Sequence, residues 1–427
     1  MSKQHRRAFL ASVGLGTATL AGCTGSLDFD SDEDDENDDN SGTDNETDDS
    51  GEDSNDAPAD VTAPAIARGD SVDDFEEIVW HPMSDHTTVE GSDDALVGDQ
   101  SLLVESDEQD QAGAFRIFED GLDIEGKQLS YAVKIDSPLP ARVVFEARAP
   151  GRSDQLTSAR AIPSEFDGWM RVDAGWTGER GEPNLANVQE IRIWVEPRGD
   201  AEGSISFRVD DMRATGSADR GSVVISFDDG VASQYGTALP MLEERGWPGV
   251  AAIIPDSLNR PGRLSIEQCR EMRDAGWELS AHGGRALPEF DSSEERVRYL
   301  QNARDYIANR ISEAGARHYF VPYHRIDAAS IEDVREVYET SFIFGGQPAA
   351  SPPSEGHMIS RVNGHDASAI SGMLGLAAKY NQTVVTLVHG VGDGDLDDVT
   401  EAEFEALLDE IERHDLDVVT ASDLLDD

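Results

Sequence analysis

The sequence predicts an α/β domain preceded by an all-β domain of the sandwich type. Over residues 72–215, apolar residues recur at every second position in short runs separated by polar turns, which is the period of half-buried strands. Over residues 219–427, strand-like apolar runs alternate with amphipathic helical stretches, a pattern typical of βα units and a mostly parallel sheet. A chain of 427 residues is long enough for both domains and for further segments outside them.

Residues 1–23 are predicted to be an export signal. Arg6 and Arg7 precede a short apolar stretch rich in Ala, Gly and Thr, which resembles the twin-arginine signals that carry folded proteins across a membrane. The stretch ends in "LAGC", which resembles a lipoprotein cleavage box and makes Cys23 the lipidated residue. It is too short for a conventional membrane-spanning helix, and an uncleaved anchor is the alternative interpretation. We therefore expect the protein at the extracellular face of the cell membrane, lipid-anchored at Cys23 after twin-arginine export.

Residues 24–71 are predicted to form an acidic, disordered linker, because Asp, Glu, Ser, Asn, Gly and Thr dominate much of this segment and cannot bury a core. The acidic bias extends over the whole chain, with 87 Asp and Glu against 34 Lys and Arg and a formal net charge of −53. This charge excludes general nucleic-acid binding and disfavours docking on anionic lipid through basic patches. The composition, with only four lysines, is similar to that of proteins from salt-loving organisms; a merely acidic extracellular protein is the alternative.

The all-β domain, residues 72–215, is predicted from strands with one apolar face each. Residues 129–135, 143–147, 191–195 and 205–209 alternate apolar and polar side chains. The order of these pieces is loosely similar to jelly-roll, galactose-binding-like modules that accompany carbohydrate enzymes, so we expect a carbohydrate-binding-like sandwich. Trp169, Trp176 and Trp194 are candidates for stacking on sugar rings, with packing in the sandwich as the alternative.

The α/β domain, residues 219–427, is predicted from strands and helices in alternation. Strand-like runs are residues 222–227, 248–255, 277–281, 317–322, 340–345, 383–390 and 416–421, and helical stretches lie near residues 239–244, 265–276, 297–311 and 401–414. Cys269 falls on the apolar face of one such helix, where it is expected to be a core residue. If Cys23 is lipidated, Cys269 has no partner for an intramolecular disulfide.

Polar residues follow four of these strands at the point where each strand ends. Asp228 and Asp229 follow the first strand, His282 follows "WELSA", the sequence Pro-Tyr-His at 322–324 follows "RHYFV", and His389 follows "TVVTLV". The carboxyl ends of parallel strands meet at one edge of a sheet or barrel, so these side chains are expected to share one site. Two adjacent carboxylates at the end of a core strand repel each other, and a bound cation would relieve that repulsion.

These motifs resemble those of polysaccharide deacetylases with a NodB-homology domain, carbohydrate esterase family 4. The resemblance rests on "SFDDG" at 226–230, the strand-end His282, the "PY" turn and the late "LVHG", and it covers about half the chain, residues 219–427. It implies a distorted (β/α) barrel and a hydrolase that removes N-acetyl or O-acetyl groups from a polysaccharide of the cell surface or its surroundings.

The resemblance also implies a role for individual residues. Asp228 corresponds to the general base, Asp229 to a metal ligand and His389 to the general acid, and the Tyr323 N–H, next to Pro322, to an oxyanion donor. In such a site a divalent metal, here expected to be zinc, polarises the acetyl carbonyl and acidifies the attacking water. The carboxylate accepts the water proton and the imidazolium protonates the leaving group.

The sequence departs from the family pattern at the second metal-binding histidine. The family motif is His-x-x-x-His, whereas here His282 is followed four residues later by Ala286, which leaves the metal incompletely liganded. His324 stands where the family usually has glycine, and we hypothesise that it is a third ligand beside Asp229 and His282; a surface or substrate-contacting histidine is the alternative. Arg361 is expected to support the acid–base pair.

The sequence therefore predicts a metal-dependent polysaccharide deacetylase on an exported lipoprotein. The partners implied are a polysaccharide substrate and the membrane reached through Cys23, with no nucleic acid and no prediction about the oligomeric state. The alternative is a non-catalytic, glycan-binding surface lipoprotein with a degenerate deacetylase domain. Ala286 favours this alternative, whereas the presence of Asp228, Asp229 and His389 favours the enzyme.

Overall fold

The computed structural model describes residues 69–425. The predicted signal of residues 1–23, the lipidation site Cys23 and nearly all of the predicted linker lie outside these residues. Within residues 69–425, no helix combines the length and the apolar character needed to cross a membrane.

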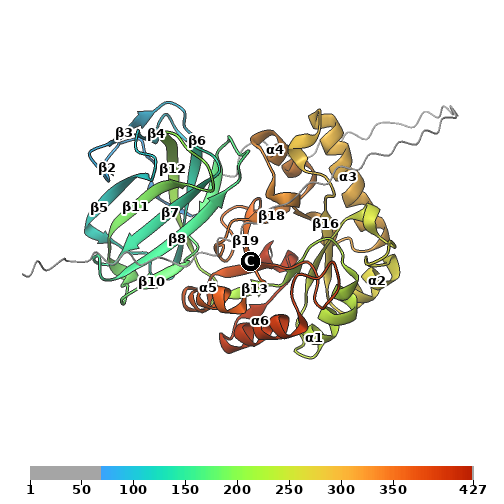
Figure 1. Cartoon of the computed structure of the whole chain (residues 1–427). Coiled ribbons are helices and arrows are strands. Elements are labelled where there is room, and N and C mark those ends of the chain that lie inside the picture. The colour runs from blue at the N-terminus through green and yellow to red at the C-terminus, as the bar shows by residue number, and fades with distance from the viewer. Residues whose placement is uncertain (1–68, 426–427) are drawn as a thin grey trace, which may run out of the picture. The chain divides into compact units, whose positions relative to one another are not determined.

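The first part of the described chain consists of two antiparallel sheets (Figure 1). One sheet has the order β3 (Thr87–Ser92), β4 (Ser101–Ser106), β12 (Ile205–Gly216), β6 (Lys127–Ser137) and β9 (Met170–Asp173), and β1 (Asp70–Asp73) pairs with β12. The other has the order β10 (Gly178–Arg180), β8 (Gln155–Ile162), β7 (Ala141–Arg148), β11 (Val188–Pro197), β5 (Ala112–Leu122) and β2 (His81–Pro82).

The two antiparallel sheets bury the alternating apolar residues that predicted them. Tyr131 on β6 stacks on Phe145 on β7 with ring centroids 5.3 Å apart, which joins the two sheets through their inner faces. Trp176 belongs to this core, with 4% of its surface exposed, so it is not available to stack on a sugar. The indole N–H of Trp194, on β11, donates to the Glu196 carboxylate at 2.8 Å.

The second part is built on one nine-stranded sheet whose paired strands are all parallel. Its order is β14 (Ser226–Phe227), β15 (Val250–Ile253), β16 (Glu278–His282), β17 (His318–Phe320), β18 (Thr340–Phe344), β19 (Ile359–Asn363), β20 (Thr383–Leu387), β13 (Ser222–Val224) and β21 (Asp417–Val418). β13 and β14 are separated by Ile225 alone, and β13 pairs with β20 while β14 pairs with β15. The sheet is therefore curved into a half-barrel or more, with its carboxyl ends on one side.

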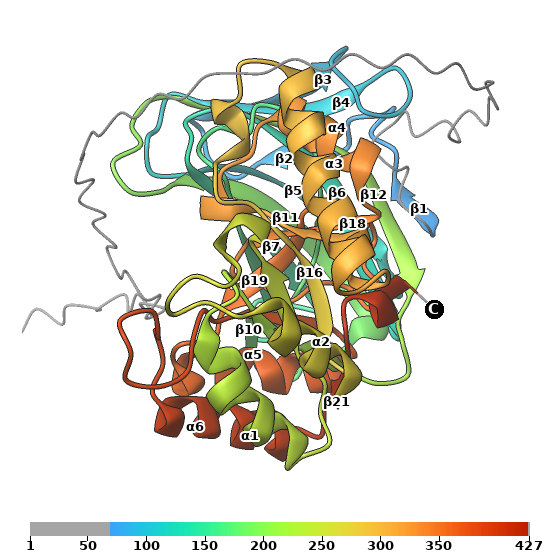
Figure 2. The ribbon, with the colours of Figure 1, turned by 90° about the vertical axis from the view of Figure 1, so that its right-hand side faces the viewer.

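Helices cover the outside of this parallel sheet, as Figures 1 and 2 show. They are α1 (Leu239–Glu243), α2 (Ile266–Asp274), α3 (Ser293–Arg310), α4 (Ala328–Val337), α5 (Ala367–Tyr380) and α6 (Glu401–Arg413). α3 packs beside α4 and α5 beside α6. Two capping boxes begin α2 and α6, at Ser265 and Thr400, where a side-chain oxygen accepts from the third backbone N–H of the helix.

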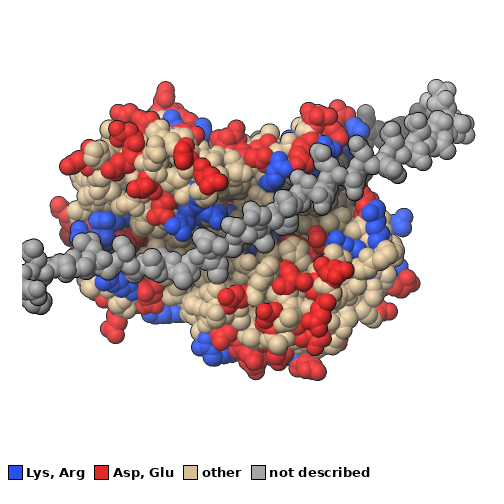
Figure 3. Space-filling view, viewed as in Figure 1, with Lys and Arg blue, Asp and Glu red and all other residues tan. Residues whose placement is uncertain are grey.

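The architecture confirms the α/β class and the parallel sheet, with an antiparallel all-β part before it. Cys269 lies in α2 and is completely buried, as the helical pattern predicted. Strand β19 and helices α4 and α5 were not predicted. Asp and Glu side chains are spread over the face shown in Figure 3, and the Lys and Arg side chains there form smaller groups.

Candidate active site

The motif "SFDDG" forms a sharp turn at the carboxyl end of β14. Asp228 is buried, and its backbone N–H donates to the Val388 carbonyl at 2.8 Å, which continues the pairing between β14 and the end of β20. The next two residues have left-handed backbones, with φ of 73° at Asp229 and 62° at Gly230. Aspartate tolerates this region better than most residues and glycine adopts it freely. The turn therefore places the two carboxylates in different surroundings.

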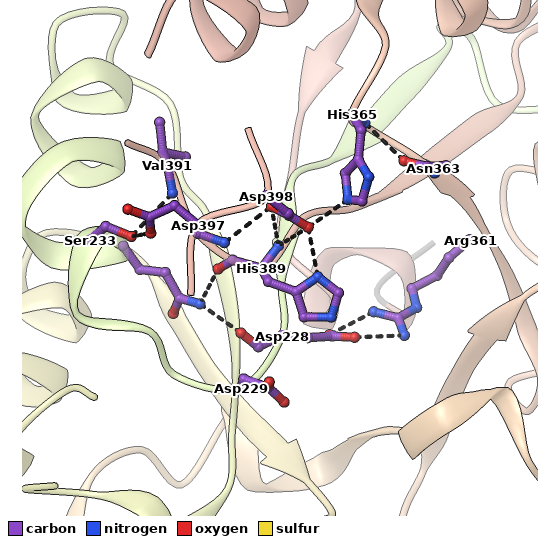
Figure 4. Close-up of polar contacts among 12 residues, drawn as sticks. Asp228, Asp229, Ser233, Arg361, Asn363, His365, His389, Val391, Asp397 and Asp398 are labelled. Atoms are coloured by element: carbon purple, nitrogen blue, oxygen red, sulfur yellow. Dashed lines mark hydrogen bonds and ion pairs between the residues drawn. The ribbon is translucent and has the colours of Figure 1, made fainter. Parts of the chain in front are cut away.

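Asp228 is held by Arg361, which comes from β19. Nη1 of Arg361 donates to Oδ1 of Asp228 at 2.7 Å and Nη2 donates to Oδ2 at 3.0 Å, a two-point fork in which both side chains are buried (Figure 4). The guanidinium also lies over the Phe320 ring, 5.1 Å from its centroid. Burial alone would raise the pKa of Asp228, but the Arg361 charge and hydrogen bonds, with the nearby His282, hold it far below its usual range. The carboxylate is therefore ionised at any working pH.

His389 is held by a second carboxylate, Asp398, in the loop after β20. Nδ1 of His389 lies 2.7 Å from Oδ2 of Asp398, and the backbone N–H of His389 donates to both oxygens of this carboxylate at 3.1 Å (Figure 4). Nε2 of His365 lies 2.5 Å from the same Oδ2. One carboxylate thus faces two imidazoles, and its contact with Nδ1 leaves Nε2 as the reactive nitrogen of His389.

The charges around His389 favour its protonated form. Partial burial alone would lower the pKa of His389, but the hydrogen bond to Asp398 and the charges of Asp228 and Asp398 raise it above the usual value. Burial alone would likewise raise the pKa of Asp398, but the hydrogen bonds with His365 and His389 hold it well below its usual range. The arrangement provides an ionised carboxylate at Asp228 and a readily protonated imidazole at His389.

Gln234 connects the two sides of the site. Its side-chain Nε2 donates to the backbone carbonyls of Asp228 and His389, at 2.7 Å each, and the residue is completely buried. The carbonyls belong to residues at the ends of neighbouring strands, so this amide fixes their separation. Because a buried amide with two short hydrogen bonds moves little, Gln234 positions the acid and the base relative to each other.

Asp229 and His282 lie side by side, as the sequence predicted for metal ligands. Nδ1 of His282 donates to the Phe320 carbonyl at 2.6 Å, which directs Nε2 toward Oδ1 of Asp229 at 3.4 Å. Burial would raise the pKa of Asp229, but its contact with His282 lowers it. A backbone acceptor behind an imidazole is common at metal-binding histidines, since it orients the ring. Two donors of the expected set therefore lie next to each other.

No third metal ligand lies with Asp229 and His282, at either Ala286 or His324. Ala286 is buried, with 1% of its surface exposed, and offers no ligand atom. Within residues 69–425, the metal-type donors that lie within 4.8 Å of one another in a group of three are His365, His389 and Asp398, not a set with His324. Catalytic zinc has three protein ligands as a rule, so the residues around Asp229 do not fit such an ion.

The turn at residues 322–324 is strained where the family usually has glycine. Tyr323 and His324 both have φ of 55°, a left-handed backbone that is unfavourable for side chains of this size. The Tyr323 ring is exposed, and its hydroxyl donates to the Gly284 carbonyl at 3.2 Å. The His324 ring packs against Phe344 with centroids 5.2 Å apart. Although part of this ring is exposed, desolvation by the surrounding protein, together with the Arg361 charge, lowers the pKa of His324 to about 4.

Sequence reasoning missed Asp398, His365, Gln234 and Arg263. Asp398 is one of several aspartates in the stretch "GDGDLDD", and nothing in this pattern distinguishes it from the others. His365 follows a strand, β19, that was itself not predicted, so no strand end pointed to it. Gln234 and Arg263 act through backbone carbonyls and a neighbouring carboxylate, and such contacts have no fixed spacing in a sequence.

Comparison with known proteins supports a deacetylase domain in this part of the chain. Residues 215–339 match the family model described as polysaccharide deacetylase. This span includes Asp228, Asp229, His282 and the turn at 322–324, and it ends before Arg361 and His389. None of the curated proteins compared with the chain matches it.

Solved structures show weak likenesses. The CE4 domain of a multidomain xylanase from the hindgut metagenome of Trinervitermes trinervoides is 14% identical and covers 49% of this chain and 91% of its own, with a TM-score of 0.37. A family 4 acetyl xylan esterase from Clostridium thermocellum, solved with a cobalt ion, is 13% identical over 48% of this chain and 90% of its own, with a TM-score of 0.33. A family 11 carbohydrate-binding module from Clostridium thermocellum, solved with a mixed-linked tetrasaccharide, is 16% identical over 34% of this chain and 94% of its own, with a TM-score of 0.27. Because these likenesses are weak, the function proposed next rests on the family-model match and the site geometry.

Proposed function

We propose that residues 219–427 hydrolyse acetyl groups on a polysaccharide. The observation that carries this proposal is a pair of groups at one sheet edge whose pKa values shift in opposite directions: Arg361 lowers the pKa of Asp228, and Asp398 raises the pKa of His389. Two titratable groups whose surroundings push their pKa values apart are the usual sign of an assigned base and acid. The match of residues 215–339 to the polysaccharide deacetylase model supports a polysaccharide as the substrate.

The proposed reaction uses these two groups in order. Water attacks the acetyl carbonyl carbon while Asp228 accepts its proton, and the carbonyl oxygen becomes an oxyanion. The Tyr323 backbone N–H is the proposed donor to this oxyanion. As the bond from carbon to the glycan nitrogen or oxygen breaks, Nε2 of His389 gives its proton to the leaving atom, and acetate departs. The proton on Asp228 then leaves through solvent, and a proton returns to Nε2 of His389, whose Nδ1 stays in contact with Asp398.

A divalent metal, zinc in the sequence-based prediction, remains a prediction for this site. Asp229 and His282 are the residues that would hold it; His324, the third ligand expected from the sequence, does not lie in a ligand group with them. Because the donor set is short by one residue, the steps above use only groups of the chain itself.

We further propose that the protein acts outside the cell, anchored by lipid at Cys23 after twin-arginine export, in a salt-loving organism. The acidic composition and the N-terminal motifs support this proposal. Replacing Cys23→Ser should release the protein from the membrane fraction into the medium, and replacing Arg6 and Arg7 by lysine should retain it inside the cell.

The activity is tested by acetate release from acetylated glycans at molar salt. Full-length protein is incubated with acetylated chitooligosaccharides, acetylated xylan and envelope glycan. Acetate should appear with at least one of them and fall to background with Asp228→Asn and with His389→Gln. Asp291→Asn, at an exposed position, is the matched control and should keep full activity.

The second candidate function is glycan binding without catalysis. It is favoured by Ala286, which removes a metal ligand from the family set. Absence of acetate from every substrate, together with glycan binding that survives Asp228→Asn, would establish this alternative over the enzyme.

A further inference from the structure

A cation of the chain itself already occupies one side of Asp229. Nη1 of Arg263 donates to the Asp229 backbone carbonyl at 2.9 Å and lies 3.3 Å from Oδ2 of the same residue. His282 faces the other oxygen, Oδ1, at 3.4 Å. Both oxygens of this carboxylate therefore have a nitrogen neighbour within the protein, and one of the two neighbours carries a permanent positive charge.

The backbone holds Arg263 in this position. Arg263 forms an antiparallel bridge with Val231, two residues after Asp229. On either side of this bridge, the Leu264 N–H donates to the Gly230 carbonyl at 2.8 Å, and the Ala232 N–H donates to the Gly262 carbonyl at 2.9 Å. The loop that carries the guanidinium is thus paired with the residues that follow the two aspartates. Arg263 is part of the same local structure as the motif, not a surface side chain that happens to lie nearby.

The position of Arg263 and the absence of a third ligand both disfavour a divalent ion at Asp229. A divalent ion at Asp229 would find two protein donors instead of three and would lie beside a guanidinium of like charge. Conversely, a guanidinium is always charged, and it bonds carboxylate and carbonyl oxygens through several N–H groups. It therefore supplies the charge that balances Asp229 without any ion.

We propose that Arg263 takes the place of the metal at Asp229, so that this chain holds its site together with a guanidinium and binds no stoichiometric divalent metal there. This proposal concerns the site of the proposed deacetylase and rests on that function for its catalytic meaning, but its test is metal binding and is independent of acetate release. Ala286 and Arg263 then act in the same sense: Ala286 offers no ligand atom, and Arg263 supplies the positive charge beside Asp229.

The test measures metal content and affinity on the full-length protein at molar salt. The protein is exposed to zinc, dialysed against weak chelator, and its bound zinc is measured by mass spectrometry; zinc affinity is measured by titration calorimetry. The wild type should retain well under one equivalent. Arg263→Gln should bind zinc about 10-fold more tightly than the wild type, because it frees Oδ2 of Asp229. Arg263→Gln combined with Ala286→His should gain about 100-fold or more, since it adds the third ligand.

Matched variants control for the charge and the loop. Arg263→Lys keeps a cation and should leave zinc binding as weak as in the wild type. Arg260→Gln removes an exposed arginine from the same loop and should also change nothing. Circular dichroism and thermal unfolding on each variant show that the fold is retained.

Two results would overturn the proposal. One is a wild type that retains one equivalent of zinc and loses it on Asp229→Asn or His324→Ala, which would make His324 or another donor the third ligand. The other is a correctly folded Arg263→Gln with the zinc affinity of the wild type, which would show that the guanidinium does not compete with an ion. Acetate release that persists in chelator agrees with both proposals, whereas no acetate and no bound zinc would reject only the deacetylase.

Discussion

Arg361 donates two hydrogen bonds to the Asp228 carboxylate, from Nη1 to Oδ1 at 2.7 Å and from Nη2 to Oδ2 at 3.0 Å, although the two residues lie 133 positions apart in the chain. The pair joins the turn after β14, at one end of the sheet order, to β19, and both side chains are buried. The fork keeps Asp228 ionised but makes it a weaker base than an ordinary carboxylate.

Arg361→Gln should be costly for both stability and activity. A buried carboxylate without its partner typically costs about 3–5 kcal/mol of unfolding free energy, because the charge remains without compensation. Acetate release should fall by about 100-fold or more, since the base loses the orientation that the fork gives it. Denaturant unfolding and initial rates measure the two effects. Arg298→Gln, which removes an exposed helix pair with Glu294, should cost under about 0.5 kcal/mol. Equal effects of the two variants would contradict a special role for Arg361.

Asp398→Asn should shift the pH dependence of the reaction. The carboxylate raises the pKa of His389, and His389 must be protonated to act as the acid, so the rate falls as pH rises through that pKa. With the charge removed, the pKa of His389 falls, and the alkaline decline of kcat/KM should move to lower pH. A pH–rate profile shows this shift. Asp395→Asn, at an exposed position in the same loop, should leave the profile in place. An unmoved profile in Asp398→Asn would mean that another group is the acid.

Much of this site could be predicted because strand ends and short motifs are local signals. "SFDDG" predicted both the strand and its two carboxylates, and the apolar runs before His282 and His389 predicted that these residues lie at strand ends. The partners of these residues could not be predicted in the same way. Asp398 and Arg263 lie in loops. The contacts of a loop residue depend on how the whole chain folds, and they follow no fixed spacing in the sequence.

The unexpected strand β19 illustrates the same limit at the level of the fold. Residues 359–363 are only five residues long and contain Ser360 and Arg361, so they have neither a continuous apolar run nor a clean alternation. The strand is fixed by its pairing with β18 and β20 on both sides. The sequence placed Arg361 in support of the acid–base pair, and the strand order shows that it binds Asp228, the base.

Gly315→Ala should destabilise the strand that carries His282. A Cβ at Gly315 would lie 2.0 Å from the Leu279 carbonyl oxygen on β16, a contact with rigid backbone. Such overpacking usually costs about 1–3 kcal/mol, and more where the backbone must move. Gly372→Ala, in the interior of α5, meets nothing within 4 Å and should instead stabilise by up to about 1 kcal/mol. Chemical denaturation should show a lower unfolding free energy for Gly315→Ala and a higher one for Gly372→Ala. An unchanged unfolding free energy in Gly315→Ala would show that β16 and the turn at 315–317 separate easily.

Glu278 should make stability depend on pH in the acid range. It lies at the start of β16, where Oε1 is 2.9 Å from Nε2 of the buried His318 and accepts from the Ser422 hydroxyl at 2.6 Å. Burial would raise the pKa of Glu278, but these contacts lower it from its ordinary value of 4.5 to about 2. Between these two pH values the unfolded chain binds more protons than the folded one. The contribution is therefore complete above pH 4.5 and is lost as pH falls toward 2.

The size of this effect follows from the same pKa values. The difference corresponds to at most about 3 kcal/mol of unfolding free energy, carried by a group with 5% of its surface exposed. Glu278→Gln should therefore be less stable than the wild type at neutral pH, and the two unfolding curves should converge as the pH falls from about 4.5 to about 2. For Glu412→Gln, at an exposed position, the unfolding free energy should depend on pH in the same way as that of the wild type. A constant gap between Glu278→Gln and the wild type down to pH 2 would mean that the carboxylate acts through packing and hydrogen bonding alone, and not through its charge.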